Sequence, residues 1–167
     1  MTIRFISIIT TPITSHIRRF AKLSYLEKRL FIEAVMLTFF FRLIILTIPF
    51  RKIAPFLGKQ MIETCSKENP VPTRILLNQI SLSINRASRF VPWQAKCLVQ
   101  AMTGKTMLRK RAMESTLYLG LAKENNQNEL IAHAWLRCGR EIICGGGGLI
   151  RFTIVAYFGP SLLKKQT

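Results

Sequence analysis

The fold is decided by residues 92–144, which read PWQAKCLVQAMTGKTMLRKRAMESTLYLGLAKENNQNELIAHAWLRCGREIIC. Pro92 is well placed to open a helix, because its fixed φ suits a first helical turn, and the apolar pattern carries this helix past Cys97 to Leu108. Short apolar runs follow, separated by polar or glycine positions, and these predict antiparallel strands. The expected strands are residues 115–122, 131–137, 141–144 and, after four glycines, 150–157. The sequence therefore predicts an α+β fold in which a helix carrying Cys97 packs on an antiparallel sheet.

A strongly apolar region precedes this stretch, at residues 16–59. Ser24 and Glu27 have the spacing of a capping box, which predicts a helix that runs to about Ile48. Basic residues flank the apolar run on both sides, and Arg42 lies inside it, where a charge in lipid would be costly. We therefore expect this helix to dock on a partner, on a membrane surface or on its own domain rather than to span a membrane.

A polar segment with two prolines, residues 63–73, follows the apolar region and is typical of a linker. Residues 74–90 then carry apolar side chains at helical spacing, which predicts an amphipathic helix. These boundaries divide the chain into an apolar and basic helical region at 1–62, the linker, and a core at 74–167.

Charge and composition exclude several kinds of site. The chain has 167 residues, with 25 Lys and Arg against 8 acidic residues and a formal net charge of +17. All the acidic residues are glutamates, so an aspartic protease dyad, a Walker-B site and an EF-hand are excluded. The excess of base favours an anionic partner, either a membrane surface or an acidic peptide. No motif supports nucleic-acid readout, so we expect no nucleic-acid partner.

The four cysteines indicate a reduced chain. Cys65, Cys97, Cys138 and Cys144 have irregular spacings, and no convincing secretory signal peptide precedes them. We therefore expect free thiols and a cytoplasmic location. The spacing of His133 from Cys138 and Cys144 matches no common zinc site, so neither a metal nor another cofactor is expected.

Cys97 and His133 are the two residues that make a credible nucleophile and base. A thiolate forms most readily near a helix start and beside an imidazole, and Lys96 adds positive charge next to Cys97. The two side chains need not be close in sequence if the fold brings them together. The alternative is structural, because a cysteine on an apolar helix is usually a small buried hydrophobe.

The motifs around this pair resemble those of a known family, the transglutaminase-like cysteine peptidases that remove the leader from lasso-peptide precursors. The resemblance is to the stand-alone peptidase, whose leader-recognition domain is a separate chain, and it covers about residues 22–158. Its specific part consists of the Pro-(x4)-Cys-Leu-(x)-Gln-Ala and Ala-His-Ala-Trp motifs. The blocks that carry it are Glu27-Lys28-Arg29-Leu30, Phe90-Val91-Pro92-Trp93, Cys97-Leu98-Val99-Gln100-Ala101, Leu117-Tyr118-Leu119-Gly120-Leu121, Ala132-His133-Ala134-Trp135-Leu136 and Ile143-Cys144-Gly145-Gly146.

The resemblance implies a papain-like core and a leader peptidase. Cys97 would attack the scissile carbonyl, His133 would transfer the proton, and backbone amides at the start of the Cys97 helix would stabilise the oxyanion. Trp135 would form a wall of the substrate site, with core packing as the alternative. The implied partners are the leader of the precursor peptide, a separate leader-recognition protein and a cyclase. The apolar N-terminal helix would contact this assembly or the inner face of the membrane.

The chain departs from this family in one respect. Members usually carry an aspartate a dozen or slightly more residues after the histidine, and this chain has none. Glu141, an asparagine of residues 125–128 or a backbone carbonyl could orient His133 instead. A catalytically weak or inactive scaffold of the same fold, which only assembles the maturation complex, is therefore the alternative function.

Overall fold

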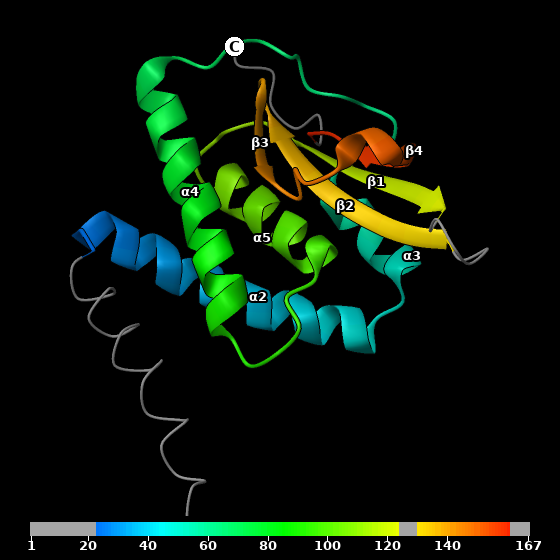
Figure 1. Ribbon diagram of the computed structural model, residues 1–167, viewed down its shortest axis with the longest axis horizontal. Helices are drawn as coiled ribbons and strands as arrows, with labels where there is room; N and C mark the ends of the chain where they lie inside the picture. The colour runs from blue at the N-terminus through cyan, green and yellow to red at the C-terminus, as the bar shows by residue number, and fades with distance from the viewer. Residues whose placement is uncertain (1–22, 124–129, 161–167) are drawn as a thin grey trace, which may run out of the picture.

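The computed structural model describes residues 23–123 and 130–160. Helices come first in the chain and a sheet of four strands follows, with short helical turns between them (Figure 1). In chain order the elements are α2 (Tyr25–Thr47), α3 (Phe50–Ile53), η1 (Ala54–Leu57), α4 (Val71–Phe90), α5 (Cys97–Arg109), β1 (Thr116–Lys123), β2 (Leu130–Cys138), β3 (Glu141–Cys144), η2 (Leu149–Arg151) and β4 (Thr153–Phe158).

The sheet confirms the predicted α+β class. Its strand order is β3-β2-β1-β4, and every neighbouring pair is antiparallel. Gly139 has a φ of +58° and turns the chain between β2 and β3, as the hairpin prediction required. Residues 145–152 cross from the β3 edge of the sheet to the opposite edge, where β4 pairs with β1. The expected strand at 150–157 is therefore shorter, because Leu149–Arg151 form a 3₁₀ turn.

Helix α2 begins at the predicted capping box. The backbone N–H of Ser24 donates to Glu27 Oε2 (3.0 Å) and the N–H of Glu27 donates to Ser24 Oγ (3.3 Å). Its inner face, Leu30, Ala34 and Thr38, is buried against α4 and α5. Figure 1 shows α2 lying along one side of the molecule, with α5 between it and the sheet and α4 crossing over α2.

Pro72, in the first turn of α4, and Pro92, just after its end, act differently from the prediction. Pro72 lies in the first turn of α4, so this helix starts at Val71 instead of residue 74. Pro92 does not open the next helix, since α5 starts only at Cys97. A proline disfavours helical geometry in the residue before it, and Val91 is extended (ψ 141°), so Pro92 ends α4 instead.

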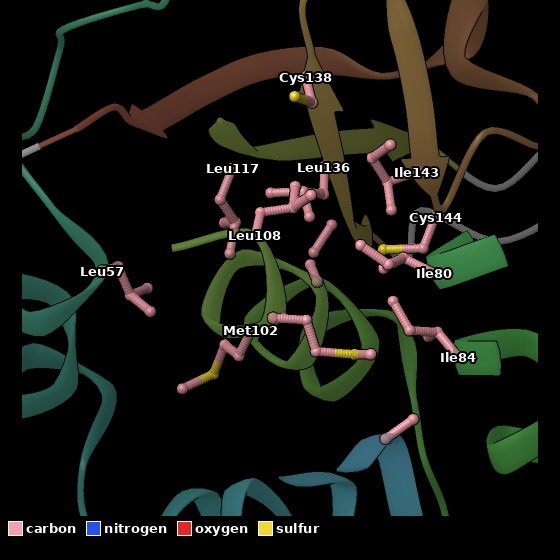
Figure 2. Packing of buried hydrophobic residues seen from close by; sticks show 14 of the residues in the cluster. Leu57, Ile80, Ile84, Met102, Leu108, Leu117, Leu136, Cys138, Ile143 and Cys144 are labelled. Atoms are coloured by element: carbon pink, nitrogen blue, oxygen red, sulfur yellow. The ribbon is translucent and has the colours of Figure 1, made fainter. Parts of the chain in front are cut away.

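The hydrophobic core lies between α5, α4 and one face of the sheet. Figure 2 shows Leu136 and Ile143 of the sheet packed toward α5, with Ile84 of α4 beside them. Gly104 makes the close approach feasible, because a Cβ at this position would lie 2.7 Å from Leu136 Cδ2 and 3.1 Å from Ile84 Cδ1. Leu136 therefore marks the face of β2 that points toward the helices.

Candidate functional site

Cys97 is the first residue of α5 and is partly exposed. Lys96 precedes it as the N-cap, and no side chain caps this end of the helix. The first N–H groups of a helix have no partner within the helix, so those of α5 are available to an anion. Cys97 therefore has the position that the family resemblance requires of a nucleophile with an adjacent oxyanion site.

His133 lies on β2 opposite Gly120 and is held on two sides. Its Nε2 lies 2.8 Å from the carbonyl oxygen of Gly145. A carbonyl can only accept, so Nε2 carries the proton in this contact. The ring of Phe152 stacks on the imidazole with centroids 4.8 Å apart, and Nδ1 has no hydrogen bond to any residue that the structure describes.

The path of the chain at Gly145 explains how a main-chain group reaches His133. Gly145 has a φ of +74°, which favours glycine. A Cβ there would lie 2.4 Å from the carbonyl oxygen of Ala134 and 2.9 Å from Cα of Trp135. The chain can approach β2 this closely only without a side chain, and the approach brings the Gly145 carbonyl to the imidazole.

Glu141 lies away from His133 in the structure. It pairs with Cys138 in the β2–β3 ladder, five residues along β2 from the histidine, which is about 16 Å at the rise of a strand. Its carboxylate instead forms an ion pair with Arg74 of α4 (3.2 Å). The asparagine alternative, residues 125–128, lies outside the described residues. Of the groups proposed from the sequence, the backbone carbonyl is the one that contacts the imidazole.

The structure does not join Cys97 and His133 in a dyad. Side chains of a strand alternate between its faces, so His133 lies on the face opposite Leu136, which contacts α5. Cys97 packs at the edge of the helical core, near Cys144. Within residues 23–123 and 130–160, no hydrogen bond connects the thiol of Cys97 with the imidazole of His133.

Trp135 shares the sheet face of His133 but is 5% exposed. Its ring stacks on Tyr118 with centroids 5.3 Å apart and covers Gly120, where a Cβ would lie 2.9 Å from Trp135 Cζ3. This position fits the packing alternative better than an open substrate wall. The structure therefore brings His133 together with Trp135, Gly145 and Phe152.

A polar cluster around the buried side chain of Arg137 fixes the far end of the same face. Arg137 donates from Nη2 to Glu63 (2.7 Å) and to the carbonyl oxygen of Thr64 (2.9 Å), and from Nε to the hydroxyl of Tyr118 (2.9 Å). Tyr118 in turn donates to Glu63. These bonds tie the segment before α4 to the sheet, and they keep the ring of Tyr118 under Trp135.

The other cysteines are unsuited to catalysis. Burial raises the pKa of Cys144 to about 12, with the nearby Cys97 adding to the effect. Burial also raises the pKa of Cys138. Both thiols stay protonated at neutral pH and behave as core residues. Cys65 is exposed and free, and it serves as a natural control for the reactivity of Cys97.

Fold and site together define an α+β protein with a cysteine at the start of a core helix and a histidine on the adjacent antiparallel sheet. Residues 44–156 match the family model described as the transglutaminase-like superfamily, and the chain belongs to that superfamily. The superfamily includes cysteine peptidases. The match runs from the second half of α2 into β4. Neither a curated protein nor a solved structure matches the chain at a significant level.

Proposed function

We propose that this chain is a cysteine peptidase that removes the leader from a lasso-peptide precursor. The observation that carries the proposal is the position of Cys97 at the uncapped start of α5, within a fold whose superfamily includes cysteine peptidases. The Cys97 and His133 motifs support the finer assignment, because they resemble those of leader peptidases. The proposed partners are the precursor leader, a separate recognition protein and a cyclase, in the cytoplasm.

The proposed reaction uses the thiol as nucleophile. Cys97 Sγ attacks the carbonyl carbon at the leader–core junction, and His133 accepts the thiol proton through its free Nδ1. The N–H groups of the first turn of α5 bind the oxyanion. His133 then protonates the leaving amine, and water hydrolyses the thioester to release Cys97. Because the two groups are separate in the free structure, the proposal requires that precursor and recognition protein bring them into contact.

The Gly145 carbonyl takes over the orienting role of the missing aspartate in this proposal. It fixes the ring and the tautomer, but as a neutral group it does not offset the charge of an imidazolium. Replacing the aspartate of a serine triad by a neutral group lowers kcat about 10⁴-fold. We therefore expect a slow peptidase, although a cysteine enzyme depends less on the carboxylate than a serine enzyme does.

The second candidate is a non-catalytic scaffold of the maturation complex. The observation that favours it is the separation of Cys97 from His133, whose imidazole is bonded to Gly145 and covered by Phe152. In this case both residues serve packing, and the chain contributes only surfaces for its partners.

One cleavage experiment separates the two candidates. Precursor and recognition protein are incubated with the wild type, with Cys97→Ala and with Cys65→Ala, and products are followed by mass spectrometry. A peptidase predicts cleavage by the wild type and by Cys65→Ala, and none by Cys97→Ala. Equal cleavage by all three would exclude Cys97 as the nucleophile. If none of the three proteins cleaves the precursor, but each still binds the precursor and the recognition protein in a pull-down, the scaffold function is supported.

A further inference from the structure

The outward face of α2 is apolar and largely exposed. Leu30, Ala34 and Thr38 point inward, and the opposite side carries an apolar stripe with side chains between 43% and 77% exposed. The stripe extends for about 32 Å along the helix. It is uncharged from Ile32 to Leu46. Its members are Tyr25, Leu26, Ile32, Met36, Phe39, Phe40, Leu43 and Leu46.

Both acidic residues of α2 are turned toward the domain and paired there. Glu27 forms an ion pair with Arg86 of α4 at 3.3 Å. Glu33 forms ion pairs with Arg111 at 2.7 Å and with Lys110 at 3.3 Å, just beyond the end of α5. No carboxylate of α2 is therefore left to oppose an anionic surface that approaches the stripe.

The charges that border the stripe are all positive. They are Lys28 and Arg29 near its start, Arg42 on its flank, and Arg51 and Lys52 beyond its end. None of these five forms an ion pair within the part of the chain that the structure describes. A long apolar stripe bordered by cations that form no ion pair among the described residues matches an anionic bilayer surface, where each base near the surface adds to binding.

The packing of α2 favours a position in the plane of the membrane. The helix is long and apolar enough to cross a bilayer. However, α4 and α5 pack along it, and α4 carries Arg74, Arg86 and Arg89. A spanning position would take these charges and the Glu33 cluster into hydrocarbon, which is costly. In Figure 1 α5 lies between α2 and the sheet and α4 crosses α2, and the apolar stripe stays exposed beside these contacts, so it can lie on a surface.

We propose that the apolar stripe of α2 binds the surface of an anionic lipid bilayer, with the helix axis parallel to the membrane. The stripe also reaches the loop before Cys97, because Phe39 packs edge-on against Trp93 with ring centroids 5.3 Å apart. Tryptophan is a common residue at membrane interfaces. Membrane binding would hold the start of α5 close to the lipid, whether or not Cys97 is catalytic.

The apolar contribution is tested by co-sedimentation of the full chain with vesicles. Pure phosphatidylcholine vesicles are compared with vesicles in which about a third of the lipid is phosphatidylglycerol. We expect the wild type to bind the anionic vesicles only. The double variant Met36→Glu/Leu43→Glu should bind them at least about tenfold more weakly, because its carboxylates would enter the apolar layer and repel the anionic lipid. The matched control, Ile75→Glu with Ile150→Glu, changes two exposed apolar residues elsewhere and should bind as the wild type does.

The electrostatic contribution is tested with two charge-matched variants. Arg51→Gln with Lys52→Gln should weaken binding about thirtyfold, while Lys67→Gln with Arg140→Gln, which removes the same charge away from α2, should have little effect. Circular dichroism verifies that each variant is folded. The proposal is overturned if both vesicle types bind equally, or if the stripe variant binds as its control does. It is equally overturned if light scattering without lipid reveals a dimer that only the stripe variant dissociates.

Discussion

Replacing Gly145 by alanine tests the contact that holds His133. The residue has a φ of +74°, and a left-handed conformation costs an ordinary residue about 1–2 kcal/mol. The added methyl group would also lie 2.4 Å from the carbonyl oxygen of Ala134, and overpacking of this kind costs about 1–3 kcal/mol. Together these effects predict that Gly145→Ala lowers the free energy of unfolding by about 2–5 kcal/mol.

Gly147→Ala is the matched control for this substitution. Nothing lies within 4 Å of a Cβ at Gly147, so alanine there should change the free energy of unfolding by less than about 1 kcal/mol. Urea denaturation of both variants gives the comparison. If Gly145→Ala is as stable as Gly147→Ala, the chain does not approach β2 as described.

Nitrogen NMR adds a readout at the histidine itself. The contact between Nε2 of His133 and the carbonyl of Gly145 predicts that, of the two neutral tautomers, the imidazole adopts the one with its proton on Nε2. Gly145→Ala should allow both tautomers, whereas Gly147→Ala should keep one. Mixed tautomers in the wild type would refute the assignment of Gly145 as the group that orients the ring.

Three further substitutions test the packing and charge of the fold. Ser24→Ala removes the side-chain cap of α2 and should cost about 0.5–2 kcal/mol in thermal unfolding. Leu136→Ala, fully buried against α5, should cost about 2–5 kcal/mol, while Leu130→Ala, 64% exposed, should cost far less in the same urea assay. Burial alone would raise the pKa of Glu33, but the positive charges of Arg111 and Lys110 lower it more, so the pKa of Glu33 lies below its usual value. The ionised Glu33 therefore stabilises the folded state at a pH above its unfolded pKa of about 4.3, and this stabilisation is lost as the pH falls through the folded pKa. The Glu33→Gln variant lacks this carboxylate, so its free energy of unfolding should fall less on acidification than that of the wild type.

The regular elements could largely be predicted because their determinants are local. The capping box at Ser24, the spacing of apolar residues in α4 and the turn at Gly139 all act within a few residues. The start of α5 could not be placed in this way. Pro92 is compatible with either a helix start or the end of the preceding helix, and the packing of α4 decides between them.

The sequence named candidate residues for the site but could not place them relative to the sheet and helices. Both faces of the second half of β2 are buried, so the alternation of polar and apolar residues that normally reveals the inner face is missing around Trp135. The sequence therefore could not show that the face of Leu136, and not the face of His133, points toward the helices. The group that contacts the imidazole is a main-chain carbonyl, which every residue has, and only the close path of Gly145 along β2 gives it a role.

The packing of α2 has a consequence for synthesis of the chain. The residues that cover Leu30, Ala34 and Thr38 belong to α4 and α5, which end at Arg109, whereas α2 ends at Thr47. At about 5–20 residues per second, a ribosome needs roughly 3–12 seconds to add the intervening length. Throughout that interval the nascent helix is apolar on its inner and its outer side at once. A membrane or a chaperone that reaches the emerging chain would thus meet α2 before its own domain does.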